Sequence, residues 1–249
     1  MSRRVLTGRS ASNAPSTHRR WDRTAVALTT LTVIVTTATA LFVVLAVQVA
    51  NVRGLARSDP RLLADIIGWR SSVLTSFAKV ITTLGTALAY LLLAGAGYWY
   101  WHKKRSLALP VAALSWMCVG LFLRFEISRL VARPRPSPVL RLVGAHGFAF
   151  PSGHTATATI GCGLMAVLLW QVVARRWRVP LVTVSVVAAA AVGLSRSYLG
   201  VHWPTDVLGG WAYGIAWVSL GGLILRIASQ RRLLGTRSVN QADCGLDGI

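Results

Sequence analysis

Long apolar runs separated by short basic segments dominate the sequence. Six of these runs approach or exceed the roughly 20 residues that a helix needs to cross a bilayer. They lie at 24–50, 80–101, 107–123 (with a helical extension to Val131), 155–174, 179–194 and 207–227. Almost no polar positions interrupt them, so none has the polar face of a helix in a soluble protein. We therefore predict an all-α integral membrane bundle of six transmembrane helices.

The segments between and beyond these runs carry most of the charge. Residues 1–23 are rich in Ser and Arg, and we expect a disordered basic tail there. In 51–79, charged residues are spaced among apolar ones, which predicts a loop and an amphipathic stretch on the membrane surface. Three prolines in 133–138 exclude a helix. The predicted organisation is a first tail (1–23), a membrane domain (24–227, with its motifs in 124–206) and a second tail (228–249).

Composition supports a membrane protein and argues against nucleic-acid binding. The chain is 54% hydrophobic and 14% charged, with a mean hydropathy of +0.55, whereas a soluble domain has about 25% charged residues. The formal net charge is +20, but the basic residues lie in tails and short loops instead of on one face with interleaved aromatic residues. This distribution favours contact with anionic lipid headgroups. We therefore expect membrane lipids, and no nucleic acid, as partners.

The same basic residues predict an orientation. Six spans place both termini on one side of the membrane, and that side carries 16 Lys and Arg against 11 on the other. The positive-inside rule assigns the more basic side to the cytoplasm. We therefore expect a multi-pass protein of the cell membrane with cytoplasmic termini, whose segments 133–154 and 195–206 face outward.

Two sequence motifs with phosphate chemistry lie at the outward ends of predicted spans. Pro-Ser-Gly-His at 151–154 directly precedes the fourth span, where Ser152 can cap the helix and Gly153 lets the backbone approach an oxyanion. Ser-Arg-x5-His-x3-Asp starts at Ser195 and places Asp206 one helical turn after His202. A carboxylate at that position can hold one imidazole nitrogen and fix the tautomer.

Together, these residue types can support attack on phosphorus. His202 is the candidate nucleophile and His154 the candidate general acid for the leaving group. Arg135 and Arg196 offer guanidinium forks for phosphoryl oxygens. Taken singly, each element also fits a structural role, such as a helix cap, a solvated basic loop or an interfacial arginine. Their joint occurrence on one side of the membrane favours catalysis.

In this order, the Arg-Pro, Pro-Ser-Gly-His and Ser-Arg-x5-His-x3-Asp motifs resemble those of the type 2 phosphatidic acid phosphatase superfamily, over about Leu84 to Ile227. The resemblance implies a phosphohistidine mechanism on a six-helix membrane core, without a metal or other cofactor. It implies His202 as nucleophile, Asp206 as its orienting carboxylate and His154 as acid. The phosphoryl oxygens would be bound by Arg135, Ser152, Gly153 and Arg196.

The first motif departs from the family pattern, which usually has a lysine seven residues before the arginine of Arg-Pro. Aligned on either Arg-Pro of this chain, that position is Glu126 or Ser128. Arg124 lies one helical turn before Ser128 on the same helical face, and Arg129 is adjacent, so either can supply the missing charge. We expect weaker activity and not inactivity, because one charged hydrogen bond is worth about 1.5–3 kcal/mol.

These observations lead us to expect an enzyme that hydrolyses a lipid phosphate or pyrophosphate at the outer face. An outward site suits the polyprenyl pyrophosphate released in cell-wall assembly, so undecaprenyl pyrophosphate is the expected substrate. Phosphatidic acid and phosphatidylglycerophosphate are alternatives. A lipid phosphotransferase and a non-catalytic lipid-phosphate-binding protein are the other two classes that the motifs leave open. The three cysteines form no CxxC pair or metal-ligand spacing, so we expect neither a disulfide framework nor a metal site.

Overall fold

The structure, a computed structural model, describes residues 17–243, which contain helices and no strand. The beginning of the first predicted tail (1–16) and the end of the second (244–249) lie outside this range. Helix occupies the remainder of both predicted tails, because the first and last helices extend beyond their predicted spans. The α-helices of the described range are α1 (Thr17–Ala50), α2 (Leu55–Gly68), α3 (Ser72–Lys104), α4 (Ala108–Val131), α5 (Gly153–Trp170), α6 (Arg178–Tyr198) and α7 (Pro204–Asp243), and two 3-10 helices cover Pro138–Leu140 and Arg175–Trp177.

The prediction of an all-α membrane bundle is confirmed. In the described range, α1, α4, α5, α6 and α7 are each long and apolar enough to cross a bilayer. The sixth span is α3, when its halves Ser72–Ala87 and Ala89–Lys104, bent by 43° relative to each other, are counted as one. As predicted, α4 continues to Val131 and the proline-rich segment that follows contains no α-helix.

One predicted boundary is wrong. Residues 51–79 were predicted to form a loop and an amphipathic surface stretch, and they do contain α2, a helix with one buried stripe. They also contain the first turns of α3, however, which begins at Ser72 instead of Val80. The early start has a local cause, because the Ser71 hydroxyl accepts a hydrogen bond from the Leu74 backbone N–H at 3.3 Å. A serine cap of this kind stabilises the first turn of a helix by accepting a hydrogen bond from a backbone N–H that has no partner within the helix.

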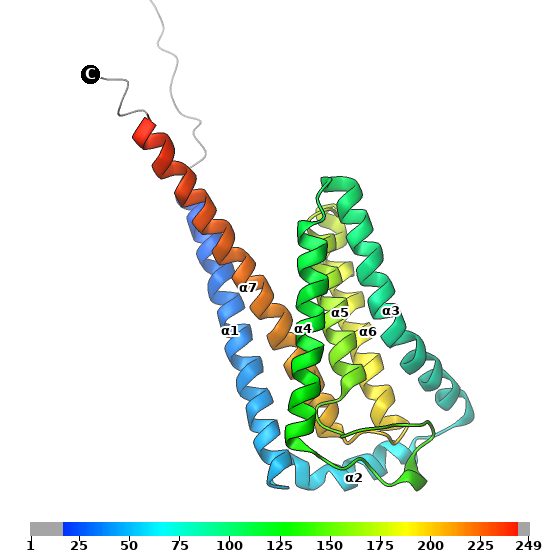
Figure 1. The fold of residues 1–249 in the computed structure, drawn as a ribbon. Helices are drawn as coiled ribbons and strands as arrows, with labels where there is room; N and C mark the ends of the chain where they lie inside the picture. The colour runs from blue at the N-terminus through cyan, green and yellow to red at the C-terminus, as the bar shows by residue number, and fades with distance from the viewer. Residues whose placement is uncertain (1–16, 244–249) are drawn as a thin grey trace, which may run out of the picture.

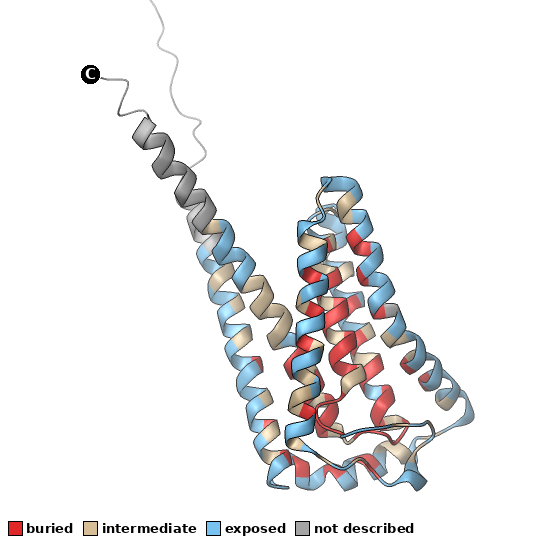
Figure 2. Ribbon diagram, viewed as in Figure 1, coloured by how far each residue is buried: buried red, intermediate tan, exposed pale blue. Residues whose placement is uncertain are grey.

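The central helix of the bundle is α5, and α3, α4, α6 and α7 pack around it (Figure 1). Helix α1 packs mainly along α7, and α2 lies across the end of the bundle where α4 ends and where α5 and α7 begin (Figure 1). Buried residues concentrate on α5 and on the parts of α6 and α7 near α2 (Figure 2). Both ends of the described chain lie at the opposite end of the bundle, as an even number of spans requires (Figure 1).

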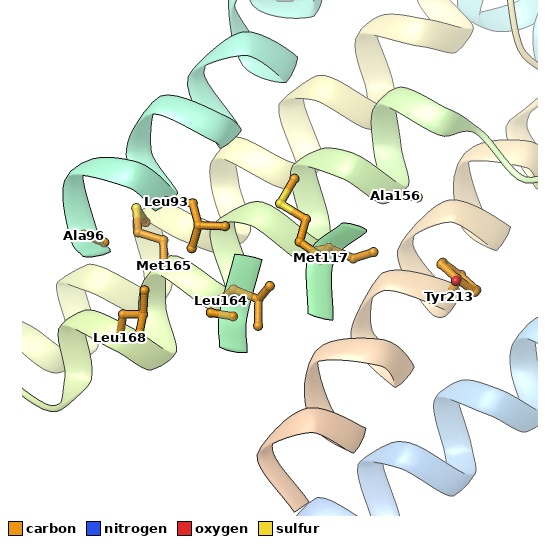
Figure 3. Packing of buried hydrophobic residues seen from close by; sticks show 10 residues of the cluster. Leu93, Ala96, Met117, Ala156, Leu164, Met165, Leu168 and Tyr213 are labelled. Carbon is orange, nitrogen blue, oxygen red and sulfur yellow. The ribbon is translucent and has the colours of Figure 1, made fainter. Parts of the chain in front are cut away.

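The core of the bundle consists mainly of aliphatic and sulfur-containing side chains from facing helices, with Tyr213 of α7 among them. Leu93 of α3, Met117 of α4 and Leu164 of α5 are buried in one cluster (Figure 3). Lipid tails are as apolar as these side chains, so close packing and interhelical hydrogen bonds, more than escape from water, hold such a bundle together. One example joins α4 to α7, where Trp116 and Trp217 stack and each indole N–H donates to the other's carbonyl, at 3.0 and 2.9 Å.

Candidate active site

The predicted motif residues come together at the end of the bundle that α2 covers (Figure 1). Four segments meet there, namely the loop after α4, the start of α5, the turn after α6 and the start of α7. Backbone hydrogen bonds join them, from the Ser152 N–H to the Asp206 carbonyl and from the Leu142 N–H to the Leu199 carbonyl, both at 3.0 Å. These bonds fix segments that are distant in the sequence against each other, so their side chains keep a defined geometry.

A glycine turn sets the position of His202. Gly200 has a φ of +74°, which lies in the left-handed region that other residues avoid. A Cβ at Gly200 would also collide with the carbonyl oxygen of Leu140. The turn closes with a hydrogen bond of 3.2 Å from the Val201 N–H to the Arg196 carbonyl. It ends α6 and turns His202 into the protein, where only 1% of the residue is exposed.

The His202 imidazole has a partner on each nitrogen. Its Nδ1 lies 3.4 Å from Oδ2 of Asp206, and its Nε2 lies 2.9 Å from Nη1 of Arg135. A guanidinium can only donate, so Nε2 accepts this hydrogen bond and carries the lone pair. We therefore assign the proton to Nδ1, where it faces the carboxylate.

Asp206 is itself held from two sides. Its Oδ2 also accepts a hydrogen bond from the Trp203 backbone N–H at 2.8 Å, and its Oδ1 accepts one from Nη1 of Arg133 at 2.6 Å. The residue is 0% exposed. These charged and neutral donors hold the carboxylate in one orientation, so that it does not rotate away from His202.

Burial lowers the pKa of His202 to about 4 from its ordinary 6.5, although Asp206 acts in the opposite direction. Above about pH 6.5 His202 is neutral in both the folded and the unfolded chain, so its lowered pKa does not affect stability. As the pH falls from about 6.5 to about 4, only the unfolded chain binds a proton at His202, and the folded state therefore loses stability. We expect the thermal midpoint of the wild type in detergent to fall more than that of His202→Gln between about pH 7 and about pH 4.5. An equal fall of the thermal midpoint in the two proteins would contradict the lowered pKa of His202.

Arg135 is held in place by backbone carbonyls around its guanidinium. Its Nε donates to the Gly147 carbonyl, its Nη2 to the His146 carbonyl and its Nη1 to the Val201 carbonyl, each at 2.9 Å. These three bonds, together with the contact to His202, aim the guanidinium at the imidazole. The guanidinium of Arg135 therefore has a fixed position beside Nε2 of His202.

Arg196 approaches the site from the last turn of α6. It is buried, with 3% of the residue exposed, and its Nη1 donates to the Thr82 hydroxyl of α3 at 2.7 Å. Within the described part of the chain, its Nε has no hydrogen-bond partner. A buried, positively charged donor without a partner is costly, and an anionic ligand would satisfy it.

The start of α5 differs in one detail from the sequence-based interpretation. Ser152 occupies the N-cap position, but its side chain makes no capping hydrogen bond. Instead, its buried hydroxyl accepts a hydrogen bond of 2.9 Å from the Thr155 hydroxyl. The cap prediction was therefore wrong, because Thr155 lies one turn further along the helix and competes for the same oxygen. His154 follows on α5 and is within electrostatic reach of Arg124, Arg135, Arg196 and His202.

The structure separates the two arginines that were considered as substitutes for the usual lysine. Arg124 reaches the site, since its Nη1 lies 3.5 Å from the Pro151 carbonyl oxygen and would lie 3.1 Å from a Cβ at Gly153. Gly153 thus leaves room for this guanidinium. The side chain of Arg129 is 62% exposed and lies 3.8 Å from the Glu126 carboxylate, so it points away from the site.

Two charged residues that sequence reasoning did not assign also belong to this site. Arg133 contacts Asp206, as described above, and Asp59 of α2 contacts Arg133. A signal for Asp59 was present in the sequence, because it shares a helical stripe with Ala56 and Leu63, which are the other buried residues of α2. In the described part of the chain, no group of three or more His, Cys, Asp or Glu side chains is arranged to hold a metal ion.

Comparison with known proteins agrees with this architecture. The chain is 31% identical over 160 residues to phosphatidylglycerophosphatase B of Bacillus subtilis, covering 59% of this chain and 71% of that protein. It is 35% identical over 72 residues to the undecaprenyl-diphosphatase of Sulfolobus acidocaldarius, covering 29% and 31%. The crystal structure of a transmembrane PAP2-type phosphatidylglycerolphosphate phosphatase from Bacillus subtilis shares the fold, with a TM-score of 0.67 and 24% identity over 78% of this chain and 96% of that chain.

The family match covers the segments that carry the sequence motifs of the site. Residues 107–230 match the PAP2 superfamily, and this range contains α4, the loop after it, α5, α6 and the start of α7. The resemblance drawn from the three sequence motifs is thereby confirmed. The chain belongs to the PAP2 superfamily.

Proposed function

We propose that the chain is a membrane phosphatase that hydrolyses a lipid phosphate or pyrophosphate through a phosphohistidine at His202. The observation that carries the proposal is the buried imidazole whose Nε2 lone pair faces Arg135 while its Nδ1 proton faces Asp206. A neutral imidazole in this tautomer is a competent nucleophile, and a guanidinium beside it is suited to hold the group under attack.

The reaction proceeds in two steps. First, Nε2 of His202 attacks phosphorus in line, the bond between phosphorus and the lipid-side oxygen breaks, and His154 donates a proton to that oxygen. Then a water molecule, deprotonated by His154, attacks the phosphohistidine, which releases phosphate and restores His202. In both steps Arg135 and Arg196 bind phosphoryl oxygens and offset the negative charge of the transition state.

The start of α5 completes the cradle for the phosphoryl group. The first backbone N–H groups of a helix have no partner within it, and the helix dipole favours an anion there. The N–H groups at Ser152 and Gly153 are at this position, although the Ser152 N–H is already bonded to the Asp206 carbonyl. We therefore assign the backbone contribution mainly to Gly153, and to Ser152 a contact through its hydroxyl.

Arg124 replaces, in binding the phosphoryl group, the lysine that the family usually has in its first motif. Its guanidinium lies against Pro151 and Gly153, so it is near the group that the site binds, whereas Arg129 is exposed. An arginine starting one turn earlier on α4 than the usual lysine can reach the same place, because its side chain is longer and its fork holds two oxygens.

The two arginines form a matched pair for testing this assignment. We expect Arg124→Ala to lower kcat/KM by about 10- to 100-fold, because a charge-assisted hydrogen bond is worth about 1.5–3 kcal/mol. Arg129→Ala should leave kcat/KM within about twofold of the wild type, because exposed ion pairs contribute little. Both variants remove one arginine from the same helix, so they control for net charge and insertion. Equal effects of the two substitutions would contradict the role of Arg124.

The substrate that we propose is undecaprenyl pyrophosphate, with phosphatidic acid and phosphatidylglycerophosphate as alternatives. The site lies at the end of the bundle opposite the ends of the described chain (Figure 1). The excess of basic residues on the terminal side favours cytoplasmic termini, and the site then faces outward, where polyprenyl pyrophosphate is released. The similarity to a protein named undecaprenyl-diphosphatase supports this choice, and the similarity to a phosphatidylglycerophosphatase supports the alternative.

Phosphate release from the purified protein tests the proposal. The protein in detergent, with EDTA present, is given undecaprenyl pyrophosphate, phosphatidic acid and phosphatidylglycerophosphate in turn. We expect release that survives EDTA, with the highest kcat/KM for undecaprenyl pyrophosphate. Transfer of phosphate to an added alcohol, without free phosphate, would instead identify a phosphotransferase. No turnover of any of the three would count against the enzyme proposal.

A further inference from the structure

Asp59 is a fully buried carboxylate on α2, the helix that lies across the end of the bundle (Figure 1). It shares its helical stripe with Ala56 and Leu63, which are buried as well. Removing a carboxylate from water is costly unless charged and hydrogen-bonding partners compensate. An acidic residue on the buried stripe of an amphipathic helix therefore depends on specific partners.

The hydrogen-bond partners of the Asp59 carboxylate belong to the candidate active site. Its Oδ1 accepts a hydrogen bond from the Thr205 backbone N–H at 3.0 Å, and its Oδ2 accepts one from the Thr205 hydroxyl. Thr205 is the residue directly before Asp206 in the first turn of α7. The carboxylate of Asp59 therefore holds the helix start from which Asp206 projects, and it does so at the positive end of the helix dipole.

Arg133 connects the same carboxylate to Asp206 directly. Its Nη2 lies 2.5 Å from Oδ2 of Asp59, and its Nη1 lies 2.6 Å from Oδ1 of Asp206. The guanidinium is 5.6 Å from the centre of the Trp203 ring, and its Nη1 also donates to the Thr205 hydroxyl at 2.7 Å. One planar fork thus bridges two buried carboxylates, which a lysine ammonium would not do in the same geometry.

We propose that Asp59 is a positioning residue for the phosphoryl-transfer step, acting on His202 through Arg133 and Asp206. This inference rests on the proposed function. Asp59 fixes the orientation of the Arg133 fork, the fork holds Oδ1 of Asp206, and Oδ2 of Asp206 is then left facing Nδ1 of His202. The surface helix α2 is in this way part of the catalytic architecture, although it carries none of the family's motifs.

The charges of the network agree with this role. Asp59, Arg133 and Asp206 together carry one net negative charge, with two carboxylates against one guanidinium. When Nε2 of His202 forms its bond to phosphorus and Nδ1 keeps its proton, the ring becomes cationic. The negative charge of the network stabilises this cation in a buried, weakly screened place. With Asp59 uncharged, the charges of Arg133 and Asp206 would cancel, and the imidazolium would be stabilised less.

The test compares Asp59→Asn with Asp65→Asn, which alters an exposed carboxylate on the same helix. Full-length proteins in detergent micelles are assayed on undecaprenyl pyrophosphate and on phosphatidic acid, with kcat and KM determined separately. We expect Asp59→Asn to lower kcat by about 10- to 100-fold and to change KM by less than about threefold, since Asp59 does not contact the substrate. Asp65→Asn should match the wild type. Phosphate release by the wild type tests the proposed function separately.

A double-mutant cycle with Arg133 distinguishes positioning from a merely structural role. Arg133→Lys should by itself reproduce the loss in kcat, which also covers the case in which Asp59→Asn does not fold. In the Arg133→Lys background, Asp59→Asn should cost less than about threefold more, because the two residues act as one unit. An unchanged kcat in either folded single variant, a loss confined to KM, or fully additive effects would overturn the proposal.

Discussion

Replacing His202 by alanine should reduce phosphate release by at least about 10³-fold, because covalent catalysis has no substitute for its nucleophile. The reason is geometric as well as chemical. Nε2 of His202 is the nitrogen that faces the Arg135 fork, and in the proposed mechanism His154 has the separate task of protonating the leaving oxygen. With ³²P-labelled substrate and rapid acid quenching, the wild type should carry label on the protein and His202→Ala should carry none.

His102→Ala is the matched control for this substitution. His102 is an exposed histidine in the last turn of α3, at the end of the bundle away from the site. Its replacement should leave phosphate release and protein labelling unchanged. Substantial release by His202→Ala, in protein that elutes and melts like the wild type, would disprove the phosphohistidine mechanism.

The fold was predictable because the bilayer imposes its own length and polarity on each span. Runs such as 155–174 and 207–227 need no tertiary information to be recognised as membrane helices. The grouping of His154 and His202 at one end also follows from counting spans. The start of α3 did not follow from hydropathy, because the Ser71 cap begins the helix before its apolar run.

The charged network was harder to predict, because its contacts join distant segments. Asp59 and Arg133 are 74 residues apart. Asp59 lies outside the motifs, and the Arg-Pro motif that contains Arg133 has no spacing that indicates a partner for it. For Arg124 the helical periodicity of α4 gave the correct face, but the choice between Arg124 and Arg129 required the position of Gly153. Helical periodicity predicts on which face of a helix a residue lies, whereas tertiary packing determines what that face contacts.

Asp206→Asn should lower kcat by about 10³- to 10⁴-fold, although it changes only one atom of the side chain. The carboxylate now accepts hydrogen bonds from Arg133, the Trp203 N–H and, at Oδ2, the Nδ1 proton of His202. An amide must turn its NH₂ group toward one of these donors. When it faces His202, the imidazole has to accept at Nδ1, so the proton moves to Nε2 and the lone pair that attacks phosphorus is lost.

The measurement is kcat on undecaprenyl pyrophosphate and phosphatidic acid, with Glu126→Gln as control. Glu126 is a half-exposed carboxylate on α4 that pairs only loosely with Arg129, at 3.8 Å, and its neutralisation should leave kcat unchanged. The same loss should appear in the rate of protein labelling, because formation of the phosphohistidine is the step that needs the Nε2 lone pair. If Asp206→Asn is labelled as fast as the wild type and only releases phosphate more slowly, then Asp206 serves the hydrolysis of the intermediate and not the tautomer of the nucleophile.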